Sequence, residues 1–281
     1  MEKEKIEYQT IGGKEGLEQD SGGKEGLEQG SGGKEGLEQG LEDKEGEGKE
    51  TGFGCRKEAD RELNRREKAG LAWEKIASAQ KVLIGIGQEW KADGCLSARE
   101  NDRVRKAYEG LCRLVKDKDY FIVTTLTDGA VYEAGFDRDR IVAPCGNEHW
   151  LQCAKACTKD IWEEGEVEGL SCPHCGGLLT ANTIKAEHYI EEGYLPMWRA
   201  YQAWLAGTLN RELAVLELGE GFSAPTVIRW PFEKTVFFNR KAWMFRVHRE
   251  FSQVAAEISE RSTPVAEDSA EWIAWAAGHE A

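Results

Sequence analysis

Short, continuous runs of apolar residues alternate along the chain with longer segments in which apolar residues recur at helical spacing. Continuous runs bounded by turn residues are typical of strands that are buried on both faces of a parallel sheet. The alternation of strands and helices predicts an α/β fold with a Rossmann-like parallel sheet. Strands are expected at residues 81–87, 120–126, 140–143, 213–218 and 235–238, and helices at 57–79, 97–116, 131–134, 195–209 and 249–260.

The predicted strands fall into two groups on either side of a cysteine-rich segment. We assign residues 53–150 and 213–281 to the two parts of one Rossmann-like domain. The second part ends in C-terminal helices, where Trp272, Ile273 and Trp275 are expected to dock on the sheet domain. Residues 151–212 are assigned to an inserted zinc-binding and small helical module.

Residues 1–52 differ from the rest of the chain in composition. The sequence GGKEGLEQ occurs at residues 12–19, 22–29 and 32–39, so a glycine-rich unit repeats every ten residues. One leucine per unit cannot offset the entropy that is lost when the unit becomes ordered. We expect a disordered acidic tail, with a tract that binds a partner protein as the alternative interpretation.

The net charge of −14 argues against a nucleic-acid-binding groove, because such a groove needs a basic face to displace counterions. No stretch reaches the ~18 consecutive apolar residues that a membrane span requires. The first residues, MEKEKIEYQTI, hold no apolar run typical of a signal peptide. We therefore expect no nucleic-acid partner, no membrane partner and a location in the reducing cytoplasm.

Four cysteines form two close pairs, Cys153-x3-Cys157 and Cys172-x2-Cys175, separated by fourteen residues. This spacing lets two tight turns present four thiolates to a tetrahedral Zn²⁺ ion. A thioredoxin-like redox pair at CPHC and two disulfides are the alternatives. Zinc is favoured because it explains both pairs, and four cysteine ligands predict a structural ion with no position open for water. His174 is expected to point outward.

Two predicted strands run directly into glycine turns, Gly85-Ile86-Gly87 and Gly219-Glu220-Gly221. Glycine pairs at strand ends let backbone N–H groups approach a pyrophosphate, so the two turns fit a dinucleotide that lies across the carboxyl edge of the sheet. The alternative is that both are tight turns without a ligand. The carboxylate of Glu89 is unfavourable beside a phosphate unless it turns away.

The order of these features resembles the sirtuins, which are NAD-dependent enzymes with a four-cysteine zinc module inserted in a Rossmann-like domain. The resemblance covers about residues 82–258 and is carried by GIG, TTLTDG, a polar corner, the paired cysteines, GEG and FFNR in that order. The sequence is most similar to a bacterial sirtuin-like branch, in which some members are linked to protein ADP-ribosylation. It implies NAD and Zn²⁺ as cofactors and an acylated or ADP-ribosylated protein as substrate.

Transferred position by position, the resemblance implies roles for individual residues. Asp128 matches the aspartate that supports the nicotinamide pocket, and the four cysteines match the zinc ligands. The residues implied in cofactor binding are Gly85, Gly87, Thr125, Asp128, Gly219, Gly221, Ser223 and Asn239.

The chain departs from the family at two catalytic positions, since Leu126 replaces an asparagine and Cys145 replaces the catalytic histidine. A thiol with a pKa near ~8.5 can replace that general base only if its pKa is lowered, for example by His149. Cys145, Asp128 and His149 are the catalytic candidates. We expect NAD-dependent ADP-ribosyl or acyl transfer with release of nicotinamide, rather than ordinary deacetylation. The alternative is a catalytically silent NAD or ADP-ribose sensor or scaffold.

Overall fold

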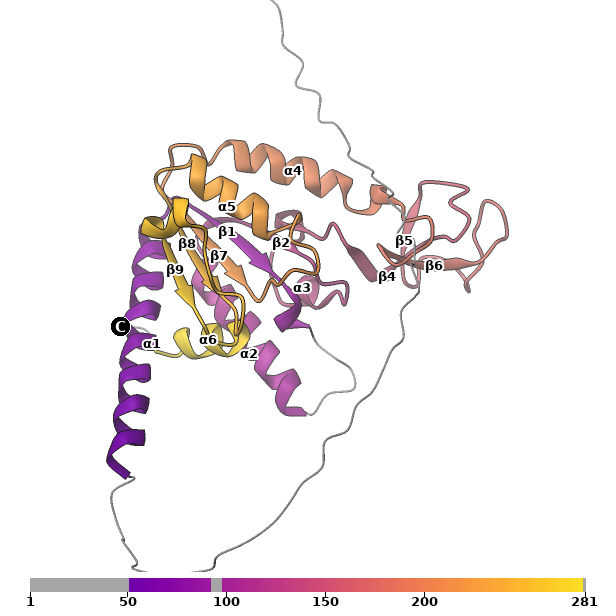
Figure 1. The fold of residues 1–281 in the computed structure, drawn as a ribbon. Helices are drawn as coiled ribbons and strands as arrows, with labels where there is room; N and C mark the ends of the chain where they lie inside the picture. Colours follow the sequence, from indigo (N-terminus) through magenta and orange to yellow (C-terminus); the bar gives the residue numbers. More distant parts are fainter. Residues whose placement is uncertain (1–50, 92–97, 280–281) are drawn as a thin grey trace, which may run out of the picture. The chain divides into compact units, whose positions relative to one another are not determined.

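The computed structural model describes residues 51–91 and 98–279 (Figure 1). The predicted acidic tail lies outside these residues except for Thr51 and Gly52, which belong to helix α1 (Thr51–Ser78). The predicted helix start at Ser97 also lies outside them. Within the described ranges, no helix combines the length and the hydrophobicity that crossing a bilayer requires.

A six-stranded parallel sheet forms the centre of the described part of the chain, with the order β3-β2-β1-β7-β8-β9. This is the order of a doubly wound Rossmann sheet, in which the chain starts in the middle and builds outward in both directions. The fold class predicted from the sequence is therefore confirmed. The strands are β1 (Lys81–Ile86), β2 (Asp119–Thr124), β3 (Ile141–Val142), β7 (Leu213–Leu218), β8 (Ala242–Val247) and β9 (Ser262–Val265).

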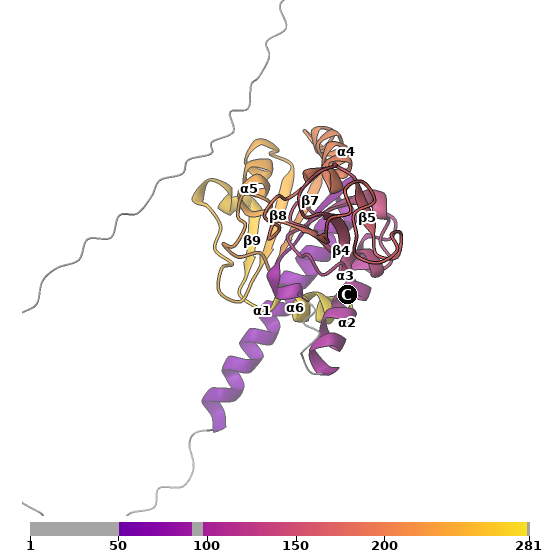
Figure 2. The same ribbon diagram turned by 90° about the vertical axis from the view of Figure 1, so that its right-hand side faces the viewer.

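Helices cover both faces of the parallel sheet (Figures 1 and 2). Helices α1, α2 (Ala98–Val115), α3 (Ala130–Glu133) and α6 (Ser269–Ala276) pack on one face, and α4 (Leu195–Ala206) and α5 (Arg229–Phe238) on the other. Strand side chains alternate between the faces, so that Ile84 joins the first core and Leu83 the second. Short 3₁₀ helices lie at Gln88–Trp90, Arg138–Arg140, Glu191–Gly193 and Ala256–Arg261.

The strand predicted at residues 235–238 is wrong, because these residues end helix α5. Ile228, Phe232 and Val236 recur at helical spacing and are fully buried, whereas Phe237 and Phe238 are 50% and 70% exposed. Burial of one helical stripe thus outweighs the local β preference of the aromatic run. The predicted helix at residues 249–260 is also wrong, since an irregular segment and a 3₁₀ helix precede β9 there.

The cysteine-rich segment forms a second, antiparallel sheet in the order β5-β4-β6. Its strands are β4 (Gly146–Cys153), β5 (Ile161–Glu163) and β6 (Leu179–Thr183), so the module boundary predicted at residue 151 falls inside β4. Helix α4, which was expected in this module, packs on the parallel sheet. Its Tyr201 and Trp204 rings lie 5.4 and 5.8 Å from the ring of Phe121.

Candidate functional site

The two glycine turns meet where the order of the parallel sheet reverses, between β1 and β7. The backbone N–H of Gly87 donates to the carbonyl oxygen of Leu218 over 2.8 Å. A Cβ atom at Gly87 would lie only 2.4 Å from Cα of Glu220. The turns after β1 and β7 are therefore in direct contact, at the carboxyl edge where open α/β sheets bind ligands.

The other glycines of the two turns have different surroundings. A Cβ at Gly85 would lie 2.5 Å from Cγ2 of Ile228, so this glycine allows close packing below α5. Gly219 has a φ of +69°, and a Cβ there would lie 2.6 Å from Cβ of Glu89. Gly221 has room for a Cβ, and Ser223 is exposed. Close packing thus explains Gly85 and Gly219 without a ligand.

Replacing Gly87 with alanine is expected to weaken NAD binding and to lower the free energy of unfolding by about 1–3 kcal/mol. The added Cβ meets backbone atoms of Gly219 and Glu220, which cannot rotate away as a side chain can. Urea denaturation and NAD titration of Gly87→Ala measure both effects.

The control for this prediction is Gly70→Ala in helix α1, where no atom lies within 4 Å of the added Cβ. This change is expected to stabilise the protein by about 0.5–1 kcal/mol, because alanine favours the helix. Unchanged stability and NAD affinity in Gly87→Ala contradict the close contact of the two turns.

The carboxylate of Glu89 is bound by the chain segments that follow β8 and β9. One oxygen accepts hydrogen bonds from the backbone N–H and the hydroxyl of Ser269, over 2.9 and 2.7 Å. The other oxygen accepts from the backbone N–H of Arg249 over 3.0 Å. Glu89 therefore joins α6 to the loop after β8, which agrees with the sequence-based condition that it turn away from a phosphate.

A buried carboxyl group spans the carboxyl end of β1. Thr125 follows β2, and its hydroxyl donates to Oε2 of Glu220, which follows β7, over 2.7 Å. The Glu220 side chain is 1% exposed, and its Oε1 has no hydrogen-bond partner among the described residues. Burial and the charge of Glu217 raise the pKa of Glu220 to about 7, although Thr125 and Arg229 act in the opposite direction.

Sequence reasoning treated Glu220 only as the residue between Gly219 and Gly221. The available signal was a carboxylate two residues after the end of a strand predicted to be buried, where solvation is poor and a charge is costly. The hydrogen bond between Thr125 and Glu220 could not be predicted, because it depends on the order of the strands in the sheet.

Cys145 lies between β3 and β4 and is 4% exposed. Burial and the nearby charge of Glu220 raise the pKa of its thiol to about 11. His149 was expected to lower that pKa, but its Nδ1 lies 2.9 Å from Oε2 of Glu164 and its ring is exposed. That pair raises the pKa of His149. Among the described residues, the groups that act on the pKa of Cys145 raise it, and none lowers it.

Asp128 and His149 lie at a corner between the two sheets. The carboxylate of Asp128 accepts from the backbone N–H of Ala130 at the start of α3, over 3.1 Å. Gly129 has a φ of +75°, and a Cβ there would lie 2.8 Å from Cδ2 of His149. A pocket of about 380 Å³ opens beside this corner, lined by Gly129, Tyr132, Glu133, Arg138, Asp139, Asn147, His149, Trp150, Glu163, Glu164, Gly193 and Met197.

Asn239 does not belong to this edge of the sheet. Its side-chain amide donates to the carbonyl oxygens of Thr208 and Arg211, over 2.9 and 3.0 Å. Both residues precede β7, and Asn239 itself precedes β8, so the side chain joins loops at the amino ends of these strands. The structure therefore does not bring Asn239 together with the other residues implied in cofactor binding, which lie at the carboxyl ends.

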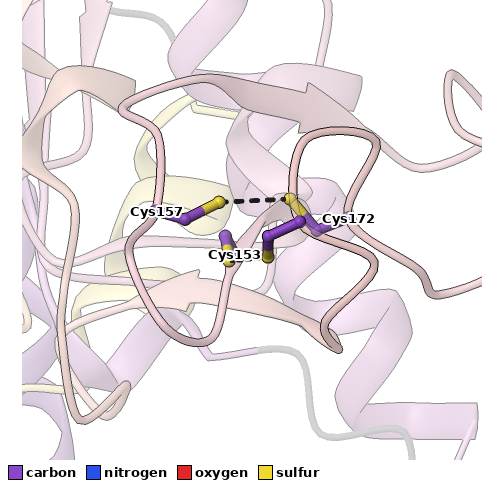
Figure 3. Close-up of side chains that lie close together, drawn as sticks. Cys153, Cys157 and Cys172 are labelled. Carbon is purple, nitrogen blue, oxygen red and sulfur yellow. Dashed lines mark hydrogen bonds between the residues drawn. The ribbon is translucent and has the colours of Figure 1, made fainter.

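The four cysteines predicted to bind zinc lie together, with all four sulfur atoms within 4.8 Å of one another. Figure 3 labels three of them, Cys153, Cys157 and Cys172. The sulfurs of Cys153 and Cys175 are 3.7 Å apart and those of Cys157 and Cys172 are 3.6 Å apart. Zn–S bonds of about 2.3 Å in a tetrahedron give S···S distances of about 3.8 Å, whereas a disulfide is about 2.05 Å long. The geometry fits one Zn²⁺ ion and does not fit two disulfides.

His174 is not part of this cluster, since its Nε2 pairs with Oδ2 of Asp160 at 2.7 Å. The outward orientation expected from the sequence is therefore confirmed. The loops around the cysteines pack a small core of their own, in which Leu151 and Leu179 are buried together with Cys153 and Cys172. So small a core needs a further constraint, which a metal bound by the four cysteines would supply.

A network of buried charges lies below the Glu220 loop. Glu217 on β7 pairs with Nε of Arg246 on β8 at 2.7 Å and with Nη1 of Arg229 on α5 at 3.3 Å. Arg229 also donates to the carbonyl oxygens of Glu220 and Phe251, over 3.2 and 2.9 Å. The network therefore holds the loops after β7 and β8 in place at the carboxyl edge. The sequence analysis missed it.

No family model matches the chain. It is 24% identical over 183 residues to a protein ADP-ribosyltransferase of Staphylococcus aureus (strain Mu50), covering 59% of this chain and 58% of that protein. A probable bifunctional ADP-ribose hydrolase/ADP-ribosyltransferase of Fusarium oxysporum f. sp. cubense is 24% identical over 141 residues, 42% of this chain and 24% of that protein. The chain thus spans less than two thirds of either relative.

Among solved structures, a Sir2 enzyme and a Sir2 homologue in complex with NAD are similar to this chain. They are 14% and 12% identical and cover 76% and 74% of this chain and 96% and 91% of their own, with TM-scores of 0.48 and 0.49. The chain resembles the sirtuins. The order of motifs predicted this resemblance, and the two sequence relatives carry the name ADP-ribosyltransferase.

Proposed function

We propose that this sirtuin-like protein binds NAD at the carboxyl edge between β1 and β7 and transfers an ADP-ribosyl or acyl group with release of nicotinamide. The observation that carries the proposal is the contact of the Gly87 and Glu220 turns where the strand order reverses. Ligands of open α/β sheets bind at this position. The ADP-ribosyltransferase names of two relatives support ADP-ribosyl transfer to a protein acceptor.

The residues at this edge fit a nucleotide in two respects. Glu220 presents a buried carboxyl oxygen without a hydrogen-bond partner among the described residues, which a ribose hydroxyl can satisfy. The carboxylate of Glu89 is occupied by Ser269 and Arg249 and so does not oppose a phosphate. When bound, NAD supplies a ribose carbon that reacts as nicotinamide leaves, and Thr125, Glu220 and the surrounding apolar residues orient that ribose and exclude water.

Ordinary deacetylation is not part of the proposal. Cys145 takes the place of the catalytic histidine, and its thiol has a pKa of about 11. Leu126, in the place of the asparagine, is 3% exposed and offers no polar side-chain atom. These two substitutions also favour the second candidate function, that of a catalytically inactive protein that binds NAD or ADP-ribose without converting it.

Zinc has a structural role in this proposal. All four protein ligands are cysteines, so a tetrahedral ion has no position left for water or substrate. The metal would hold β4 and β6 in register, and with them the corner that carries His149. Four reduced thiolates require a reducing compartment, which fits the cytoplasm expected from the sequence.

Incubation of the zinc-loaded protein with NAD that is labelled in the nicotinamide ring is expected to release free nicotinamide. Labelled ADP-ribose is expected to bind saturably and to raise the melting temperature, since a ligand that binds only the folded state stabilises it. Binding without nicotinamide release supports the silent sensor. An unchanged melting temperature with both ligands rejects NAD binding, and a scaffold without a nucleotide site then remains.

A further inference from the structure

The sirtuin-like site lacks a suitable proton acceptor at the position where the family has one. Cys145 is buried, and its thiol is protonated in all but about one molecule in 10⁴ at neutral pH if its pKa is about 11. His149 is exposed and paired with Glu164, outside the buried cluster of Cys145, Thr125 and Glu220. A transfer reaction at this edge therefore needs another base.

Glu220 has the geometry that this role requires. Its carboxyl group crosses the end of β1 and is fixed from one side by the hydroxyl of Thr125, at 2.7 Å from Oε2. Its backbone is fixed from below by Arg229, which donates to the carbonyl oxygen of Glu220 over 3.2 Å. Oε1 is buried and left without a hydrogen-bond partner among the described residues. One oxygen is thus oriented and the other is available.

Resting on the proposed function, we infer that the carboxylate of Glu220 is the proton acceptor of this site, in place of the histidine that the resemblance assigns to the position of Cys145. The resemblance assigned roles only to the neighbours of Glu220, Gly219 and Gly221. A role in proton transfer also explains why a carboxyl group is buried between two strand ends.

Glu220 takes the proton that an acceptor hydroxyl or a water molecule loses as its oxygen bonds to C1′ of the nicotinamide ribose. The electrons of the broken C1′–N bond go to nicotinamide, which leaves as a neutral molecule. The carboxylate becomes a carboxylic acid and later releases its proton to solvent. The step needs no oxidant or reductant, and one proton is produced for each nicotinamide.

Several charged and titratable groups face Glu220 from the elements around it. Burial and Glu217 favour the protonated form, whereas Thr125, Arg229 and the backbone N–H of Ala224 favour the carboxylate, and the balance places the pKa at about 7. A base with this pKa is ionised in a large fraction of molecules near neutral pH, where a carboxylate of ordinary pKa is too weak a base. Cys145, Gln88 and His248 line the same edge.

The test compares wild type with Glu220→Gln, which keeps the shape of the side chain but cannot accept the proton. Release of nicotinamide from NAD is expected to fall by about 100-fold or more, which is the usual contribution of a general base. Affinity for ADP-ribose is expected to fall far less than the rate, because the side-chain amide of glutamine can still hydrogen-bond to a ribose hydroxyl. The wild-type rate is expected to rise with pH around a midpoint of about 7, and Glu220→Gln is expected to lose this dependence.

Thr125→Val provides a second variant that retains the carboxyl group. It removes a hydrogen bond that lowers the pKa of Glu220, so the midpoint of the rate profile is expected to move to higher pH. A purely structural role of Thr125 changes the rate without moving this midpoint.

The titration of Glu220 can also be tested without NAD, from the pH dependence of the free energy of unfolding. The folded pKa of Glu220 is raised from 4.5 to about 7, so the folded state binds more protons than the unfolded state between these values. Stability contributed by this group is therefore lost as pH rises from about 4.5 to about 7. The melting temperature of wild type is expected to fall more than that of Glu220→Gln between pH 5 and pH 8.

The outcomes separate this inference from the proposed function. If wild type releases nicotinamide and Glu220→Gln releases it equally fast, Glu220 is not the proton acceptor and the proposed function stands. If wild type binds ADP-ribose but releases no nicotinamide, both the transfer reaction and this role are rejected. Equal pH dependence of the two melting temperatures shows that the carboxyl group does not titrate near neutrality, and it overturns the inference by itself.

Discussion

Replacing the buried Cys153 with serine is expected to remove the metal from the protein and to unfold the small sheet of β4, β5 and β6. Serine keeps its proton at neutral pH and cannot supply the fourth thiolate to Zn²⁺. Structural zinc contributes about 10–16 kcal/mol in zinc-finger peptides, and the apolar core beside the cysteines is small. Metal analysis is expected to show that the zinc content falls from one ion per chain to nearly none.

Hydrogen exchange locates this effect. Amides of β4 (Gly146–Cys153) and β6 (Leu179–Thr183) are expected to lose protection in Cys153→Ser, while those of β1 and β7 keep it. Cys112→Ser is the matched control, because Cys112 is a partly buried cysteine outside the cluster that donates to the carbonyl oxygen of Ala134, as serine can. Full zinc content and full protection in Cys153→Ser contradict the metal site.

Replacing Glu217 with alanine is expected to lower the free energy of unfolding by about 3–5 kcal/mol. The change removes the carboxylate that pairs with Arg246 and Arg229, whose side chains are 1% and 5% exposed. Glu233 then still pairs with Arg246, at 2.7 Å, whereas Arg229 keeps no ion pair within 4 Å among the described residues. Urea denaturation of the two proteins at pH 7 measures the difference.

Glu212→Ala is the matched control for this prediction. Glu212 and Lys241 form an ion pair at the amino ends of the same strands, β7 and β8, with side chains that are 54% and 56% exposed. An exposed pair of this kind contributes about 0–1 kcal/mol. If Glu217→Ala costs no more than Glu212→Ala, the buried network does not hold the loops of the carboxyl edge together.

The prediction of the parallel sheet succeeded where a mostly apolar run ended at a turn signal. Residues 81–87, 120–126 and 213–218 read as buried strands, and β1, β2 and β7 lie there. It failed at β8, whose run AWMFRV carries Arg246 as its fifth residue and was not assigned to a strand. A buried arginine is tolerated there only because Glu217 and Glu233 lie opposite it, and those contacts are made between separate segments of the chain.

The candidate site was predictable in its parts. Glycines at two strand ends, the aspartate after TTLT and the four spaced cysteines all carry local signals of turn and ligand chemistry. Asn239 was expected at the end of a strand, whereas the structure places it at the end of helix α5, beside the loop that precedes β7. The function of Glu220 could not be read from its neighbours Gly219 and Gly221, because its partner Thr125 is distant in the chain.

By itself the sequence determined the alternation of strands and helices, the cysteine pairs and the two glycine turns, because periodicity and short spacings are local properties of a chain. Only the tertiary structure decided which strand ends are neighbours, how deeply Glu220 and Cys145 are buried, and which charges compensate one another. The physical reason is that burial and proximity set the pKa of a group and the cost of a charge. Both depend on contacts between residues that are far apart in the sequence.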